Sequence, residues 1–139
     1  MENLSLYKNN YESLKELSVV VGYNFIRNEK AKSGIYDAAN SLLQLEPKDV
    51  TKSVWKGEGK MTNGQRYVVE EFWKKVGEGT GIDFTTEEFS YLRNSIPLAF
   101  VFLSDLQQRT NDPKLHGAIM HMANKYNKSS TKFFAGKFV

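Results

Sequence analysis

The chain has 139 residues and no cysteine, with 40% hydrophobic residues, 25% charged residues and a net charge of +3. These values are typical of one globular domain, and they exclude disulfides, thiolate metal sites and cysteine nucleophiles. The N-terminus has no basic segment followed by an apolar one, and the longest apolar run, 96–103, is too short to span a bilayer. We therefore expect a cytoplasmic protein with no membrane segment.

Helical spacing of apolar residues begins near the N-terminus. A 4-3-7-4 pattern predicts a helix over about 11–27, with Asn10 as its N-cap: Tyr7, Tyr11, Leu14, Val21 and Phe25. A second helix is predicted over 33–45, with five residues facing inward: Ile35, Ala38, Ala39, Leu42 and Leu45.

The middle of the chain predicts two more helices. Pro47 ends the second helix and opens a short third one that carries Val50, Val54 and Trp55. Thr62 or Asn63 then caps a fourth helix with a broad apolar face: Val68, Val69, Phe72, Trp73 and Val76. Three glycines are expected to end this helix and form a flexible loop: Gly77, Gly79 and Gly81.

The C-terminal half contains clear helix starts. Thr85 and Glu88 have the spacing of a capping box, and Pro97 either kinks a helix or begins one capped by Asn94 or Ser95. Residues 98–103 are apolar on every side, which is typical of an enclosed helix. Asp112 and Pro113 begin the last helix, with a 4-3-4 apolar stripe: Leu115, Ile119, Met122 and Tyr126.

These elements predict an all-α fold. We expect a compact single-domain bundle of five to seven helices, with a central apolar helix near 97–109. Residues 1–127 form the helical domain, and residues 128–139 form a basic aromatic tail that either docks on the bundle or binds a partner.

The positive charge is concentrated in the C-terminal part of the chain. Residues 113–139 carry five lysines and no acid, whereas residues 1–112 carry 14 Lys and Arg against 16 acids. Lysines attract polyanions, so we predict nucleic-acid contacts from four of these lysines: Lys125, Lys128, Lys132 and Lys137. A second basic set, Lys48, Lys52 and Lys56, recurs every four residues near Trp55 and either contacts phosphates or forms a solvated helix face.

The aromatic residues of the tail favour a different partner. Phe133, Phe134 and Phe138 either cover their own bundle or insert into a pocket of a partner protein. The sequence leaves both possibilities open.

No pattern of catalytic residues is present. His116 and His121 lie about 140° apart on a helix and cannot share a metal. The adjacent acids Glu70–Glu71 and Glu87–Glu88 point about 100° apart, so neither pair is expected to share one catalytic cleft. The glycine-containing turns have neither Walker nor dinucleotide-binding spacing. We expect no metal, no cofactor and no enzymatic activity.

Two segments, Tyr91-Leu92-Arg93 and Pro97-Leu98-Ala99-Phe100, are similar to the small helical subunits of multi-subunit CRISPR effectors. This likeness covers a short part of the chain and implies no site residue. Small helical chains without cysteine also occur among phage-encoded viral proteins that inhibit a host machine. We predict a non-enzymatic accessory or regulatory subunit that contacts nucleic acid. The alternative is a protein–protein adaptor or inhibitor that docks through its aromatic C-terminus; the oligomeric state is left open.

Overall fold

Helices are the only regular elements in the described part of the chain. The computed structural model describes the backbone of residues 2–49 and 61–138, and the side chains of residues 12–49 and 61–126. Its α-helices are α1 (Glu2–Arg27), α2 (Glu29–Leu42), α4 (Asn63–Thr80), α5 (Ser90–Arg93), α6 (Ile96–Thr110) and α7 (Pro113–Phe138). Two 3-10 helices, η1 (Pro47–Asp49) and η2 (Glu87–Phe89), lie between them. The predicted all-α bundle of five to seven helices is confirmed.

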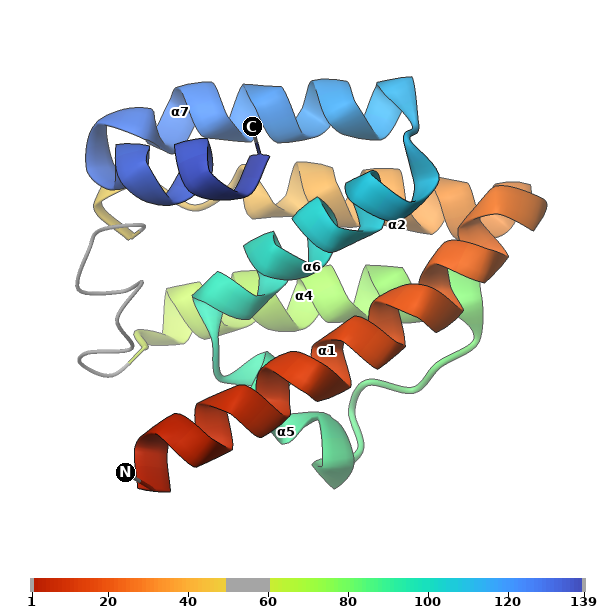
Figure 1. Cartoon of the computed structure of the whole chain (residues 1–139), viewed down its shortest axis with the longest axis horizontal. Coiled ribbons are helices and arrows are strands. Elements are labelled where there is room, and N and C mark those ends of the chain that lie inside the picture. The colour runs from red at the N-terminus through yellow and green to blue at the C-terminus, as the bar shows by residue number, and fades with distance from the viewer. Residues whose placement is uncertain (1, 50–60, 139) are drawn as a thin grey trace.

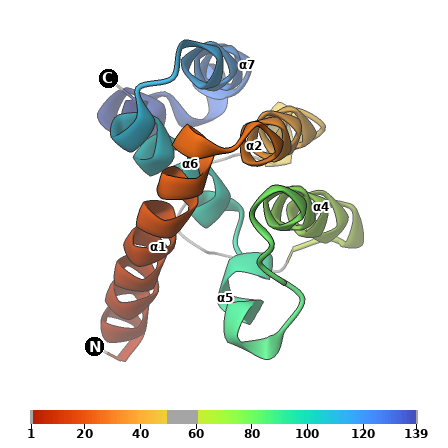
Figure 2. The same ribbon diagram turned by 90° about the vertical axis from the view of Figure 1, so that its right-hand side faces the viewer.

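The helices form two layers that cross each other. Figures 1 and 2 show α2, α4 and the first part of α7 running side by side, with α1 and α6 crossing them as a second layer. The short helix α5 lies at the base of α6 and joins it to the segment that follows α4.

Helix α6 is the centre of the core, as its apolar sequence predicts. It contacts α1, α4, α5 and α7, and every residue from Ile96 to Ser104 is buried. The helix begins where Ser95 accepts a hydrogen bond from the Leu98 N–H at 3.2 Å, with Pro97 in its first turn. The predicted Ser95 cap is therefore confirmed, and Pro97 begins a helix rather than kinking one.

The first two helices begin earlier than predicted. Helix α1 starts at Glu2, so Asn10 lies inside the helix and the predicted N-cap there is wrong. Helix α2 starts at Glu29 because the Asn28 side chain accepts from the N–H groups of Lys30 and Ala31. The described inward-facing positions of both predicted stripes are buried: Leu14, Ser18, Val21, Phe25, Ile35, Ala38, Ala39, Leu42 and Leu45.

Helix α4 continues past two of the glycines that were expected to end it. Its start is as predicted, because Thr62 and Gln65 form a reciprocal capping box. Gly77 and Gly79 are helical, and only Gly81, with φ of 77°, forms the C-cap. A Cβ on Gly79 would lie 2.8 Å from the Lys30 carbonyl oxygen, so glycine permits the close approach of α2 and α4. The predicted loop at Gly77 and Gly79 is wrong because tertiary packing overrides their weak helix propensity.

The capping box predicted at Thr85 and Glu88 is also wrong. Thr86 is the N-cap of η2 and its side chain makes no cap hydrogen bond. Thr85 instead hydrogen-bonds Asp83, whose carboxylate accepts from both the backbone and the hydroxyl of Thr85. These bonds favour the charged carboxylate and lower the pKa of Asp83. Because Thr85 is hydrogen-bonded to Asp83 in a local turn, its side chain does not form the predicted capping box.

Helix α7 begins as predicted. Asp112 accepts from the Leu115 N–H at 2.9 Å, and Pro113 occupies the first helical position. The predicted inward stripe is completely buried: Leu115, Ile119, Met122 and Tyr126.

Candidate functional site

Two of the predicted basic residues lie at one end of the bundle. Lys48 is exposed on η1 and Lys125 is exposed on α7, and the two elements are in contact. We call this surface, formed by η1, the C-terminal end of α2 and the neighbouring part of α7, the basic end. Tertiary folding therefore brings together two elements that are far apart in the sequence.

Lys125 has a structural contact as well as a charge. Its ammonium donates to the carbonyl oxygen of Leu43, at the C-terminal end of α2, and lies 5.5 Å from the centroid of the Tyr126 ring. A helix C-terminus carries partial negative charge, so a lysine is favourable there. Lys125 thus helps to attach α7 to α2.

Tyr126 and Asp49 fix the shape of the basic end. The buried Tyr126 hydroxyl is 2.8 Å from the carbonyl oxygens of both Leu42 and Leu45, and its single proton is shared between these two acceptors. Burial, followed by the negative charges of Asp49 and Glu46, raises the pKa of Tyr126. The Asp49 carboxylate accepts from the Glu46 N–H and from the Gln65 side chain, which connects η1 to α4.

Other predicted site residues lie outside what the structure describes. The helix predicted to open at Pro47 begins there as η1, but Lys52, Lys56 and the part of that helix with Val50, Val54 and Trp55 fall in residues 50–60. The backbone of residues 128–138 belongs to α7, but the described side chains do not include those of Lys128, Lys132, Lys137, Phe133, Phe134 or Phe138.

A cleft of about 410 Å³ runs along α4, beside the segment that leads to α5. It is lined by Tyr67, Glu70, Glu71, Trp73, Lys74, Phe84, Thr85 and Arg93. Glu70 and Glu71 both lie on this lining. The buried Trp73 Nε1 has no hydrogen-bond partner among the described residues. The Arg93 guanidinium, which also lines the cleft, donates hydrogen bonds to the carbonyl oxygens of Phe84 and Thr86.

The two histidines are both exposed on α7. His121 borders a smaller cleft of about 300 Å³ between α2 and α7, lined also by Tyr36, Asn40, Leu43 and Lys114. In the part of the chain that the structure describes, no group of three or more His, Asp or Glu residues is placed to hold a metal ion.

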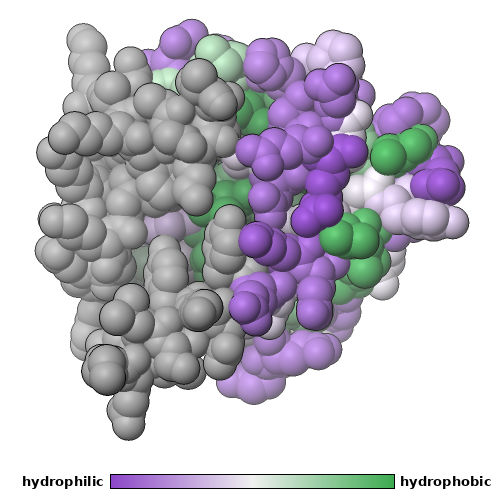
Figure 3. All heavy atoms as spheres, viewed as in Figure 1, coloured by the Kyte–Doolittle hydropathy of each residue, from purple (hydrophilic) through white to green (hydrophobic). Residues whose placement is uncertain are grey.

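An exposed apolar surface on α1 was missed by the sequence reasoning. Val19, Val20, Tyr23 and Ile26 are each more than half exposed, and we call them the outer face of α1. Figure 3 shows hydrophobic patches over the C-terminal half of α1, set among polar residues. The predicted stripe of α1 does not include these four residues, which lie on the other side of the helix.

Comparison of the chain with protein-family models, with curated proteins and with solved structures gives no match. None of the helices in the described ranges has both the length and the hydropathy needed to cross a bilayer.

Proposed function

We propose that this protein is a non-enzymatic accessory or regulatory protein that contacts nucleic acid through the basic end. The observation that carries the proposal is the contact between η1 and α7, which brings Lys48 close to the helix that carries Lys125. Three further lysines follow on α7, and residues 113–139 contain no acid. The α7 lysines have no carboxylate among them in the sequence, and such a set attracts a phosphate backbone, whereas Lys48 lies between Glu46 and Asp49.

The hydrogen bonds made by Asp49 and Lys125 support phosphate binding at the basic end. Asp49 is the acid nearest to Lys48 in the sequence, and its carboxylate accepts from Glu46 and Gln65. These bonds fix the Asp49 carboxylate in place, with one hydrogen bond to each of its oxygens. Lys125 is partly engaged by Leu43, so we assign most of the phosphate contact to Lys48, Lys128, Lys132 and Lys137.

Fluorescence anisotropy with labelled single-stranded RNA, single-stranded DNA and duplex DNA tests the proposal. We expect binding that weakens steeply as salt rises, because each neutralised phosphate releases counterions. The Lys128→Ala/Lys132→Ala variant should weaken binding at least about tenfold and flatten the salt slope by about 2, since each lysine that contacts a phosphate contributes about 1.

A matched control variant removes two positive charges that lie outside the basic end. Lys30 and Lys74 are exposed on α2 and α4, and Lys30→Ala/Lys74→Ala should change the affinity less than about twofold, because charges far from the contact are screened. Equal losses in the two double variants, salt-independent affinity, or no binding to any of the three nucleic acids would contradict the proposal.

The alternative function predicted from the sequence is docking on a partner protein through the aromatic C-terminus. It predicts that Phe134→Ala abolishes capture of that partner while Lys132→Ala has little effect. The opposite ranking favours the nucleic-acid contact.

A further inference from the structure

We propose that the outer face of α1 pairs with the same face of a second copy of the chain. In this pairing the two α1 helices lie antiparallel across a two-fold axis. The inference concerns different residues from the basic end and does not rest on the proposed nucleic-acid contact.

The exposure of the outer face is the first observation. Val19 and Val20 are each 52% exposed, Tyr23 is 60% exposed and Ile26 is 53% exposed. Single exposed apolar residues are ordinary, but four on one side of one helix make a continuous patch. The opposite side of α1 is already buried in the core through Leu14, Ser18, Val21 and Phe25. A helix that is apolar on two opposite sides is typical of one enclosed by neighbours on both.

The spacing on this side is the second observation. Glu12, Glu16, Val19, Tyr23 and Ile26 follow one another at intervals of 4, 3, 4 and 3 residues. That spacing makes a straight seam along a helix, and Val19, Tyr23 and Ile26 are its apolar part. Residues 16–27, which carry the apolar part of the seam and Arg27, span about 18 Å of helix. The described part of α1 is thus long enough to pack along a second helix.

The charges at the two ends of the seam select the partner and its direction. Glu12 and Glu16 lie at the N-terminal end of the seam. Arg27 lies at the other end, stacked 3.8 Å from the centroid of the Tyr23 ring. In an antiparallel pair, Glu16 of each copy meets Arg27 of the other, so the ion pair forms twice. A parallel pair would place Glu16 against Glu16 and Arg27 against Arg27. The face is therefore self-complementary in the antiparallel arrangement, as a two-fold interface requires.

A shallow groove beside the seam accommodates the partner. Its volume is about 500 Å³, and it is lined by Val19, Gly22, Tyr23, Ile26, Arg27, Gln108 and Arg109. With Glu16 opposite the partner's Arg27, Val20 lies opposite the partner's Tyr23. Arg109, exposed on α6 at the edge of the groove, adds positive charge on the side where the partner's glutamates arrive.

Sedimentation equilibrium of the full chain over a range of micromolar concentrations tests this pairing. We expect a monomer–dimer equilibrium. Glu16→Arg and Arg27→Glu should each raise the dimer dissociation constant at least about tenfold, because each removes both symmetric ion pairs and creates repulsion. The double variant Glu16→Arg/Arg27→Glu should restore dimerisation to within about threefold of wild type, because the opposite charges again face each other. The control Glu87→Arg, exposed on η2, should leave the constant unchanged.

A second measurement reports the register directly. The chain has no cysteine, so Val20→Cys introduces a single thiol close to the proposed two-fold axis. Under mild oxidation it should form a covalent dimer, whereas Lys74→Cys on α4 should remain monomeric. A strictly monomeric wild type, a dimer insensitive to both charge reversals, or a folded double variant that does not recover would overturn the proposal. If the wild type is strictly monomeric, the outer face of α1 would instead be a candidate contact surface for a different protein.

Discussion

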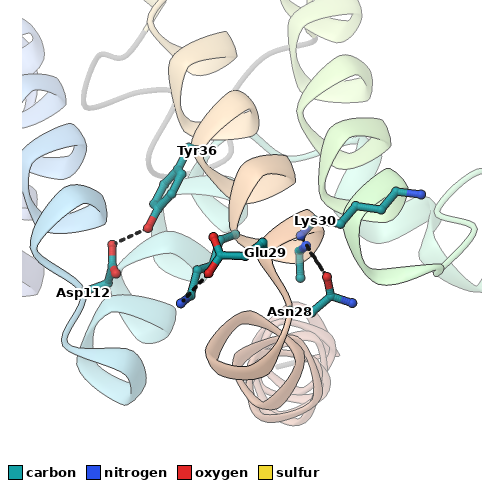
Figure 4. A network of polar contacts seen from close by, with 7 residues as sticks. Asn28, Glu29, Lys30, Tyr36 and Asp112 are labelled. Carbon is teal, nitrogen blue, oxygen red and sulfur yellow. Dashed lines mark hydrogen bonds and ion pairs between the residues drawn. The ribbon is translucent and has the colours of Figure 1, made fainter.

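Tyr36 donates a hydrogen bond to Asp112 Oδ2 at 2.8 Å, and the same oxygen accepts from the Leu115 N–H at 2.9 Å. One carboxylate therefore caps α7 and also attaches its first turn to α2, as Figure 4 shows for the Tyr36 contact. The Tyr36 ring is further held by the edge of Phe25 and by the Lys114 ammonium, 4.5 Å from the ring centroid. These contacts connect α1, α2 and α7 at one point.

Tyr36→Phe should reduce the free energy of unfolding by about 1–2 kcal/mol. A hydrogen bond to a charged acceptor contributes more than a neutral one, and the half-buried position limits the loss. Urea unfolding followed by circular dichroism measures the effect. Tyr67→Phe is the control, because Tyr67 is 62% exposed, and it should change stability by less than about 0.5 kcal/mol. Equal effects of the two substitutions would show that the Asp112 bond contributes nothing.

The same contact makes stability depend on pH at the alkaline end. Burial, followed by the hydrogen bond and charge of Asp112, raises the pKa of Tyr36 from 10.0 to about 12. Between these values the unfolded chain has released the phenolic proton and the folded chain keeps it. The stabilisation is therefore complete below pH 10 and is lost as the pH rises towards 12. The stability difference between wild type and Tyr36→Phe should narrow between pH 9 and pH 11 in urea titrations. A constant difference would contradict this linkage.

Gly34→Ala and Gly79→Ala should each destabilise the fold by about 2–3 kcal/mol, because overpacking forces backbones apart. A Cβ on Gly34 would lie 2.8 Å from the Lys75 carbonyl oxygen and 3.1 Å from the Gly79 Cα. Gly117 is the matched control, since it lies in α7 and a Cβ there meets nothing within 4 Å. Gly117→Ala should stabilise by about 0.5–1 kcal/mol through helix propensity. Thermal melts of the three variants test this opposite sign, and stabilisation by all three would disprove the close packing of α2 and α4.

Substitutions at the N-cap residues of α6 and η2, Ser95 and Thr86, should differ in their effect on stability. Ser95→Ala should cost about 1 kcal/mol, because it leaves the Leu98 N–H at the start of the central helix without its acceptor. Thr86→Ala should change stability by less than about 0.5 kcal/mol, because its side chain makes no cap bond to η2. Chemical denaturation of both variants gives the comparison. A larger loss of stability for Thr86→Ala than for Ser95→Ala would indicate that the segment 85–88 does cap a helix.

The fold could be predicted where one local signal determined the structure. Periodic apolar residues located the buried stripes of α2, α4 and α7, and Pro97 and Pro113 located two helix starts. The predictions of local structure were wrong where a distant packing partner or a competing hydrogen bond determines the conformation. Gly79 is helical because the backbone of α2 lies against it, and Thr85 bonds Asp83 rather than capping a helix. Neither partner can be read from local propensity.

The candidate sites were predicted only in part for the same reason. Charge segregation identifies the lysines, but the contact of η1 with α7 depends on tertiary folding. The outer face of α1 was missed because a solvent-exposed stripe and a buried stripe have the same sequence pattern. The predicted stripe of α1 is the buried one, and the exposure of the other side depends on how α6 packs on α1.

Tyr126→Phe should loosen the basic end without changing the core of α6. The Tyr126 hydroxyl is buried, and its loss leaves the carbonyls of Leu42 and Leu45 without this donor, at a cost of about 1–2 kcal/mol. The Leu45 and Asp49 amides close the neighbouring turns. Hydrogen exchange should therefore accelerate most at these two amides, while the α6 amides change only by the global loss of stability. Uniform acceleration throughout the chain would mean that Tyr126 supports the whole bundle rather than this end.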